Sequence, residues 1–480
     1  MYGNMKPVVA GTLSKNSSLA VLANVIKGTG SSNAWWRSIA EQNPPDHVSC
    51  QILQRLLGDR PLGNVAFRLW NGQSWPQEAG ERAATVVLTR PSSLREMLLP
   101  GSETGIGEAY LDSAFEVEGD FEAAFELADR IMEISNGWTR KLDVGRLLNQ
   151  LPPPPAPPAK IDNRARLDGN HHSLERDRKA VNFHYDVSND FYALWLGRQM
   201  AYSCAYFQNP EDDLETAQEN KFEHICRKLS LRPGDRFLDI GCGWGGLIIH
   251  AARNYGIQAE GITLSPEQLR YARERIEEAG LSGRVSVRLQ DYRELPEEPA
   301  FDAVASVGMV EHVGRKNLPV YFRKILSLLK PGGLFLNHGI GSGPVGLPGK
   351  SGSFIQDYVF PDSELIPIGE MNRFAEEQSW EVRDVENLRL HYAQTLRHWI
   401  GRLEMRRQEA LRFVNDRTYR IWRLYMAGCA HNFQTGRLAI YQTLLAKFDA
   451  KGLSRAPVVR DNWYWGRIGP ANLRGIEARE

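Results

Sequence analysis

Cysteine is scarce in this chain, which argues against two ways of stabilising a small domain. The 480 residues contain five cysteines, an odd number at widely spaced positions. They are Cys50, Cys204, Cys226, Cys242 and Cys429. No CxxC pair and no Cys/His spacing typical of zinc ligands occurs, so we expect neither a disulfide framework nor a metal site.

Net charge and long apolar runs are lacking too. The 58 basic and 58 acidic residues balance, so no global field attracts nucleic acid and we expect no nucleic-acid partner. The apolar run "LAVLANVI" at 19–26 is much shorter than the about 20 residues that cross a bilayer, and it lacks the flanks of a signal peptide. We therefore expect a cytoplasmic protein whose contact with a membrane is peripheral.

A proline run divides the chain. The stretch "LPPPPAPPAK" at 151–160 favours an extended polyproline conformation that does not join a packed core. A chain of 480 residues also exceeds one ordinary domain. We therefore expect an N-terminal domain over 1–150, a linker over 151–180 and a larger domain over 181–480.

The N-terminal domain mixes strand and helix signals. "ATVVLT" at 84–89 is typical of a strand, and the apolar spacing of "DFEAAFELADRIMEI" at 120–134 predicts a helix. We expect a small α+β domain that binds lipid or a partner. Four tryptophans either dock at a lipid interface or fill the core of this domain: Trp35, Trp36, Trp70 and Trp75.

Strands and helices alternate in the larger domain. "DRFLDIG", "QAEGITLS", "VSVRLQD" and "FDAVASVGM" resemble strands, and amphipathic helical segments separate them. This alternation predicts a doubly wound α/β sheet, whose ligands bind at the carboxyl ends of the strands. From about 350 to 430 the pattern changes to long helical segments, which we interpret as a helical lid.

A glycine-rich loop follows the first of these strands. In "FLDIGCGWGGL", Gly241, Gly243 and Gly246 satisfy G-x-G-x-x-G between a strand and a helix. Such a loop suits NAD, FAD or S-adenosylmethionine (SAM). Asp239 before the loop favours SAM, as does Thr263 at the place where a dinucleotide enzyme needs an acidic residue.

Two further segments are candidates for holding the cofactor. In "ITLSPEQ", Thr263, Leu264 and Gln268 would lie against the ribose, although this stretch also suits a helix cap. In "LQDYREL", Asp291 and Tyr292 are positioned to bond and stack on an adenine ring.

Eight stretches together resemble one family. They are "FHYDVSNDFYALWLG", "MAYSCAYF", "FLDIGCGWGGL", "GITLSPEQ", "SVGMVEHVG", "FIQDYVFPDSEL", "HYAQTLRHW" and "LYMAGCAHNF". They span about 180–450 in the order found in cyclopropane-fatty-acyl-phospholipid synthases and mycolic acid cyclopropane synthases. "GIGEAYLDSAFEVEGDFEAAF" also resembles the N-terminal domain of the phospholipid-acting members. The resemblance implies a class I, Rossmann-like SAM methyltransferase domain.

The resemblance implies a reaction and a site. Family members methylate a cis double bond of an acyl chain with SAM, and a bound bicarbonate removes the proton that closes a cyclopropane ring. The bicarbonate site falls on Cys204, Glu311, His338, the backbone of Ile340, and Tyr425. Tyr202 and Ser203 match positions beside SAM. Gly339 replaces the usual threonine after the histidine.

Taken singly, these residues have plainer interpretations. Cys204, His338 and Tyr425 each suit a core position, and Glu311 suits a helix cap. Their joint occurrence in family order favours the anion site. In that site Cys204 would help to enclose the ion and would not act as a nucleophile.

The implied substrate is a membrane phospholipid with an unsaturated acyl chain. Residues 397–423 carry eight arginines against three acids, interleaved with large apolar residues. This segment either docks on the inner face of the membrane or packs as a lid helix. The resemblance also allows a homodimer through the N-terminal domain.

Other functions remain open from the sequence. A lipid C-methyltransferase that leaves a methyl or methylene branch shares nearly all these motifs. Small-molecule N-methylation and a non-catalytic lipid-binding module are less consistent with a glycine loop, an anion site and an N-terminal lipid domain in one chain.

Overall fold

The structure, a computed structural model, has two compact units. It describes residues 44–58, 64–76, 82–134, 138–155, 164–165, 167–185, 188–346 and 354–464. One unit comprises Met1–Asp162 with Pro348–Phe354, and the other comprises Asn163–Leu347 with Ile355–Glu480. Trp35, Trp36 and the apolar run at 19–26 lie outside the described residues.

The N-terminal unit is a small α+β unit. Its strands are β1 (Val65–Arg68), β2 (Ser74–Trp75), β3 (Ala84–Leu88) and β4 (Phe115–Gly119), in the sheet order β2-β1-β3-β4. Its helices are α3 (Pro45–Leu57), α4 (Ser93–Leu98), α5 (Glu103–Leu111), α6 (Phe121–Ile134) and α7 (Trp138–Gln150). The predicted strand and helix correspond to β3 and α6. The Trp75 ring packs edge-on against Phe67, with centroids 6.2 Å apart.

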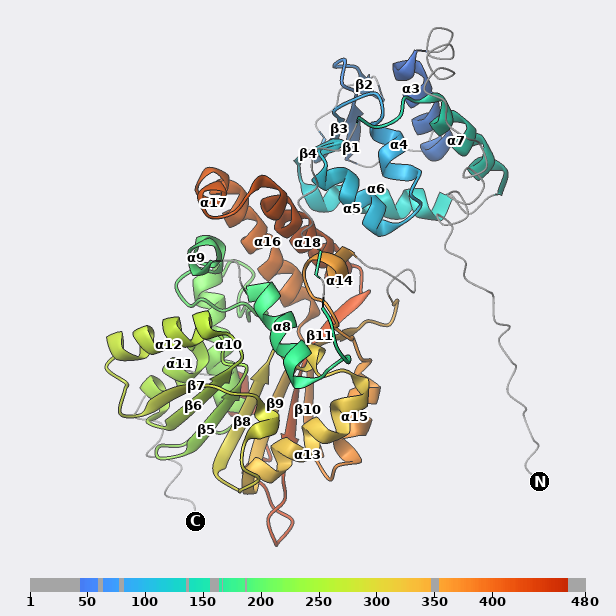
Figure 1. Cartoon of the computed structure of the whole chain (residues 1–480). Helices are drawn as coiled ribbons and strands as arrows, with labels where there is room; N and C mark the ends of the chain where they lie inside the picture. The colour runs from blue at the N-terminus through green and yellow to red at the C-terminus, as the bar shows by residue number, and fades with distance from the viewer. Residues whose placement is uncertain are drawn as a thin grey trace, which may run out of the picture. The chain divides into compact units, whose positions relative to one another are not determined.

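The larger unit contains a seven-stranded sheet in the order β10-β11-β9-β8-β5-β6-β7 (Figure 1). The strands are β5 (Arg236–Ile240), β6 (Gln258–Thr263), β7 (Val285–Leu289), β8 (Phe301–Val307), β9 (Leu329–Ser342), β10 (Glu381–Asn387) and β11 (Leu438–Ala446). Strands β5 to β9 pair in parallel, and β11 runs antiparallel between β9 and β10. This topology confirms the predicted α/β class.

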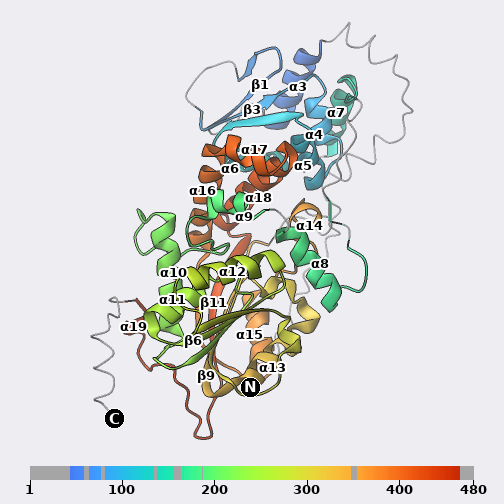
Figure 2. The same cartoon turned by 60° about the vertical axis from the view of Figure 1, so that its left-hand side comes forward.

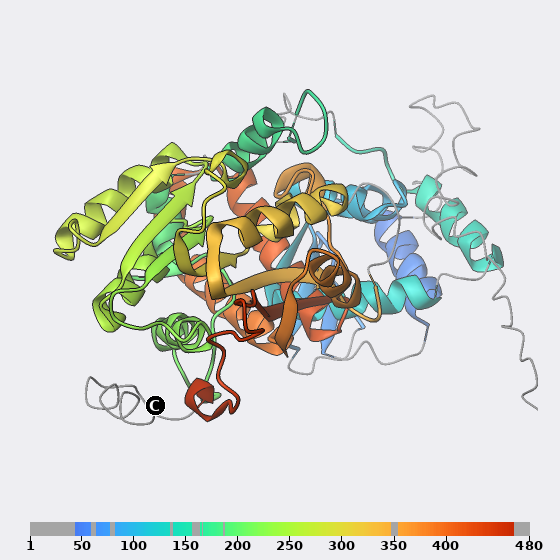
Figure 3. The same ribbon diagram turned by 90° about the horizontal axis from the view of Figure 1, so that it is seen from below.

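Helices cover both faces of this sheet. Helices α10 (Leu214–Lys228), α11 (Gly246–Tyr255) and α12 (Pro266–Glu278) contribute to the core on one face (Figure 2). Helices α13 (Leu318–Leu328) and α15 (Ile368–Glu376) contribute to the core on the other. Seen from below, the gold helix α13 lies beside the strands (Figure 3).

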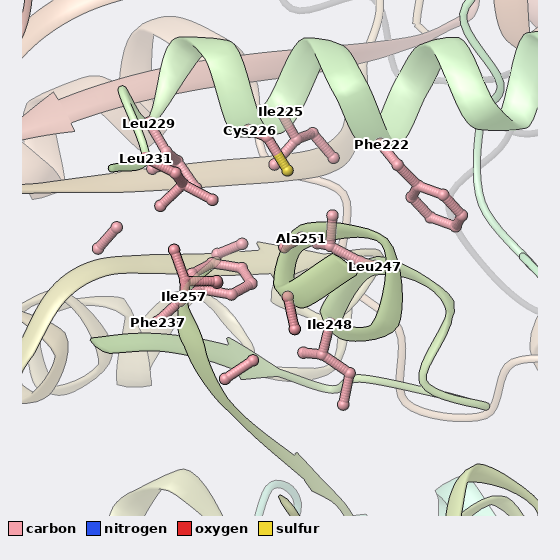
Figure 4. Packing of buried hydrophobic residues seen from close by; sticks show 14 of the residues in the cluster. Phe222, Ile225, Cys226, Leu229, Leu231, Phe237, Leu247, Ile248, Ala251 and Ile257 are labelled. Atoms are coloured by element: carbon pink, nitrogen blue, oxygen red, sulfur yellow. The ribbon is translucent and has the colours of Figure 1, made fainter. Parts of the chain in front are cut away.

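The packing of α10 follows directly from its sequence. The Asp213 side chain accepts a hydrogen bond from the Thr216 N–H at 2.8 Å and so caps the first turn. Apolar residues recur at helical spacing along one face, and Figure 4 shows this face turned towards α11 and towards Phe237 and Ile257. The residues of this face are Phe222, Ile225, Cys226 and Leu229. Burial of each large apolar side chain contributes about 1.5–3 kcal/mol.

The segment predicted as a helical lid is not helical throughout. It contains α14 (Phe354–Tyr358), α15 and the edge strand β10 before α16 (Arg389–Met405), α17 (Arg407–Phe413) and α18 (Asp416–Gln434). The strand "EVRDVEN" has few apolar residues and is mostly not buried, and its buried residue, Asp384, accepts a hydrogen bond from Lys228 Nζ at 3.0 Å. The purely helical part therefore begins at Arg389.

Short elements complete the larger unit. They are α8 (Leu174–Tyr185), α9 (Asn189–Leu196), α19 (Asp461–Tyr464) and the 3-10 turns Tyr292–Glu294, Val310–His312 and Arg315–Asn317. Among the described residues, no helix has the length and apolar character needed to cross a bilayer.

Candidate active site

The glycine loop joins β5 to α11. Gly241, Gly243 and Gly245 have φ angles of +81°, +53° and +82°, which L-residues with a side chain rarely adopt. Gly246 begins α11, and there the lack of space for a side chain, and not the φ angle, requires glycine. A Cβ there would lie 2.8 Å from Phe222 Cζ and 3.0 Å from the Gln199 carbonyl oxygen. At its glycines the loop therefore brings backbone without a side chain to the end of the sheet.

A cavity of about 130 Å³ opens at this loop. Nine of the predicted cofactor residues line it: Tyr202, Ser203, Asp239, Gly241, Gly243, Gly246, Thr263, Leu264 and Gln268. Thr263 donates to Gln268 Oε1 at 2.7 Å, so the two proposed ribose contacts already bond to each other. The cavity wall also contains residues that sequence reasoning missed, notably Lys221, Trp244, Met309 and His312.

Asp291 and Tyr292 are not in the lining, contrary to expectation. The Asp291 carboxylate accepts two hydrogen bonds from the Arg293 guanidinium, at 2.9 and 2.7 Å. The Tyr292 ring is buried and packs edge-on against Tyr321 at 5.5 Å. Both side chains are thus engaged within the fold.

Glu311 and Ile340 meet at the carboxyl end of β9. Glu311, in the turn Val310–His312, accepts the Ile340 N–H at 2.7 Å through Oε1. This N–H was expected to bind bicarbonate, but the buried carboxylate already uses it. Glu311 Oε2 has no partner among the described residues, and burial raises the pKa of the carboxyl to about 7.

His338 lies two residues before Ile340 on β9. Its Nδ1 is 3.3 Å from Nε2 of Gln442 on β11, and its Nε2 has no partner in the described part of the chain. Burial lowers the pKa of this imidazole to about 3, so the ring is neutral. With the Gln442 amide oriented this way its nitrogen donates, so Nδ1 accepts and the proton of the neutral ring lies on Nε2.

Cys204 is fully buried and its thiol points to backbone carbonyls. Sγ is 3.3 Å from the Ala205 oxygen and 3.8 Å from the Leu388 oxygen. Burial raises the pKa of the thiol well above its usual value, so no thiolate forms at neutral pH. Burial also argues against a nucleophilic role.

Tyr425 belongs to an aromatic cluster. The Tyr202 hydroxyl donates to the Tyr425 hydroxyl at 3.2 Å, and the Phe360 ring lies 5.7 Å from Tyr425 and 5.8 Å from His312. Tyr206 lies apart from this cluster, with its faces stacked on His224 at 4.3 Å and His391 at 4.9 Å.

The structure thus links the predicted residues in two pairs. Tyr202 bonds to Tyr425, and Glu311 bonds to Ile340. The positive charge of Lys221 lowers the pKa of both Cys204 and His338, although burial dominates both shifts. Within the described ranges, no group of three His, Cys, Asp or Glu side chains is arranged to hold a metal ion.

The seven-stranded sheet, the glycine loop and the cavity at the carboxyl ends of β5 and β6 define a class I SAM-dependent methyltransferase. The sequence profile described as mycolic acid cyclopropane synthetase matches residues 172–443. The chain belongs to this family.

Curated relatives extend over most of the chain. Over 403 residues it is 40% identical to a Pseudomonas putida protein named probable fatty acid methyltransferase, covering 83% of this chain and 96% of that one. Over 378 residues it is 35% identical to the cyclopropane-fatty-acyl-phospholipid synthase of Escherichia coli K12, covering 78% and 91%. Both alignments reach beyond the residues that the family profile matches.

Solved structures match the larger unit. The cyclopropane synthase MmaA2 from Mycobacterium tuberculosis superposes with a TM-score of 0.54 at 30% identity, covering 58% of this chain and all of that one. The mycolic acid cyclopropane synthase CmaA1, complexed with SAH and CTAB, superposes with a TM-score of 0.53 at 30% identity, covering 56% and 98%.

Proposed function

We propose that this protein methylates a cis double bond of a phospholipid acyl chain and closes a cyclopropane ring. In the balanced reaction the methyl carbon bonds to both alkene carbons, S-adenosylhomocysteine leaves with the C–S electron pair, and one methyl proton is lost to bicarbonate. The chain's own residues bind and orient the reactants and exclude water.

Two buried polar atoms without partners carry this proposal. Glu311 Oε2 and His338 Nε2 lie at the same end of β9, and neither has a hydrogen-bond partner among the described residues. Orphaned buried polar groups are costly and are normally satisfied by a ligand or water. His338 Nε2 donates, and Glu311 can accept a hydroxyl proton. Bicarbonate offers both an anionic oxygen and a hydroxyl, so the donor set fits it.

The aromatic cluster supports cationic chemistry on the acyl chain. Tyr202, Phe360 and Tyr425 present rings near His312 and the cofactor cavity. Aromatic faces attract cations by about 0.5–2 kcal/mol each. The same apolar surfaces exclude water, which would otherwise trap a cation as an alcohol.

The phospholipid substrate is supported by the E. coli relative, whose alignment covers 78% of this chain. We infer that the N-terminal unit assists by binding lipid or a second copy of the chain. Light scattering of the whole protein against a variant that starts at residue 163 reports a dimer made by that unit.

We also infer a peripheral membrane contact, made by a shorter part of the expected segment 397–423 and without its tryptophans. Trp399 and Trp422 are buried, so they do not face lipid, and the segment 397–423 is divided among three helices. Met405, Leu411 and Phe413 are exposed around α17 beside Arg406 and Arg412, a combination that suits an anionic surface. Replacing Leu411 and Phe413 by serine should reduce sedimentation with anionic vesicles, whereas replacing Leu289 and Val320, exposed elsewhere, should not.

A second outcome keeps the site and changes the product. The P. putida relative, at 40% identity, is named a fatty acid methyltransferase, which supports a methyl or methylene branch in place of a ring. Mass spectrometry of lipids from cells expressing the chain separates the two. A lipid that has gained one CH2 group and takes up no hydrogen under mild hydrogenation supports the ring. A lipid that keeps a double bond beside a new branch supports the second outcome.

A further inference from the structure

A buried lysine faces the cofactor cavity without a carboxylate partner. Lys221, on α10, is 1% exposed and lines the cavity. Its Nζ donates to Ser203 Oγ at 2.8 Å and lies 4.4 Å from the centre of the Phe222 ring. Within the described ranges, no carboxylate oxygen lies within 4.0 Å of it.

The second buried charge in this cavity is Asp239. It is 3% exposed at the end of β5, and its Oδ1 has no hydrogen-bond partner among the described residues. Each group acts on the pKa of the other, yet the two form no ion pair. Burial lowers the pKa of Lys221 to about 7 and raises the pKa of Asp239 to about 7.

Two buried groups of opposite charge that do not pair are unfavourable unless a ligand supplies the missing partners. A buried charge is normally paired, because removing it from water costs several hydrogen bonds that the protein must replace. Lys228 shows the usual solution two turns further along the same helix, where it bonds to Asp384 at 3.0 Å and Glu386 at 2.6 Å. Lys221 lacks such partners, and it lies beside the glycine loop.

We propose that Lys221 is the counter-cation of the α-carboxylate of the bound cofactor, acting together with the Ser203 hydroxyl. The amino-acid part of SAM carries an ammonium and a carboxylate, and the cavity offers one buried carboxylate and one buried ammonium. Asp239 then faces the cofactor's ammonium, and Lys221 faces its carboxylate. The inference rests on SAM dependence and is independent of bicarbonate and of the product formed.

Truncated ligands test this assignment without turnover. Calorimetry would compare S-adenosylhomocysteine with its decarboxylated and its deaminated analogues. Lys221→Met should weaken S-adenosylhomocysteine and the deaminated analogue by about 10- to 100-fold and leave the decarboxylated analogue unchanged. Asp239→Asn is the matched control: it should weaken S-adenosylhomocysteine and the decarboxylated analogue and leave the deaminated analogue unchanged.

A purely structural role for Lys221 predicts a different result. If Lys221→Met weakens all three ligands equally, or none, the assignment is wrong. Should Lys221→Met not fold, wild-type protein still tests it, because removal of the carboxylate alone must cost at least about tenfold in affinity. Failure of wild-type protein to bind S-adenosylhomocysteine at all would instead contradict the cofactor itself.

Discussion

Gln442 and His338 are cross-strand neighbours on β11 and β9, and the amide nitrogen of Gln442 lies 3.3 Å from Nδ1 of the imidazole. This contact places the proton of the neutral ring on Nε2, the nitrogen left without a partner. Gln442 was not among the residues predicted from the sequence. In the proposed mechanism it would act through His338, as a positioning residue.

Gln442→Glu should reverse this tautomer. The new carboxylate accepts the Nδ1 proton, so Nε2 loses its role as donor and turnover should fall at least about tenfold. Nitrogen-15 NMR of labelled histidine reads the tautomer directly. Gln394→Glu, at the partly exposed side of α16, is the control. An unchanged tautomer in Gln442→Glu would show that the contact has no directing role.

Glu311→Gln should change the pH dependence of stability. The folded pKa of Glu311 is raised from 4.5 to about 7, so the carboxyl contributes fully below pH 4.5 and its contribution is lost as the pH rises through 7. As the pH rises from 4.5 to 8, wild type should therefore lose up to about 3 kcal/mol of its free energy of unfolding relative to the variant. Urea titrations at several pH values measure it, with the exposed Glu278→Gln as control.

Gly246→Ala should destabilise the larger unit by about 1–3 kcal/mol, because the new Cβ meets Phe222 and the Gln199 carbonyl. Gly283→Ala is the matched control, since a Cβ there has no atom within 4 Å. Thermal unfolding compares them. Equal stability of the two variants would show that the loop accommodates the new Cβ without loss of stability.

Cys204→Ser should keep turnover within about tenfold of wild type, because the thiol contributes a weak hydrogen bond and no nucleophile. Wild-type Cys204 should also resist iodoacetamide in the folded protein, given its burial. Intact-mass spectrometry during turnover checks for a covalent intermediate. An adduct on Cys204, with an inactive serine variant, would reverse this interpretation.

The elements whose signals are local could be predicted from the sequence. The glycine loop follows from closely spaced glycines, of which Gly241, Gly243 and Gly245 have a positive φ, and the alternation of strands and helices follows from apolar periodicity. Strand β10 was missed because its buried Asp384 and the adjoining Glu386 bond to Lys228, far away in the sequence. No local pattern reveals such a pair.

The site divides in the same way. Thr263 ends β6 and Gln268 lies in the first turn of α12, so their place at the cavity could be predicted. Lys221 looks like any charged residue of an amphipathic helix until the sheet buries it. The bond from Asp291 to Arg293, two residues later, was not anticipated from the sequence, and the adenine contact of Asp291 stays a prediction.

The rate of ring formation as a function of bicarbonate tests the anion site most directly. In buffers freed of carbon dioxide, wild-type turnover on unsaturated phospholipid vesicles should fall and should recover saturably when bicarbonate is added. Glu311→Gln should lose most of this response while still binding S-adenosylhomocysteine. A wild-type rate that is indifferent to bicarbonate, together with a fully active Glu311→Gln, would contradict a base held between Glu311 and His338.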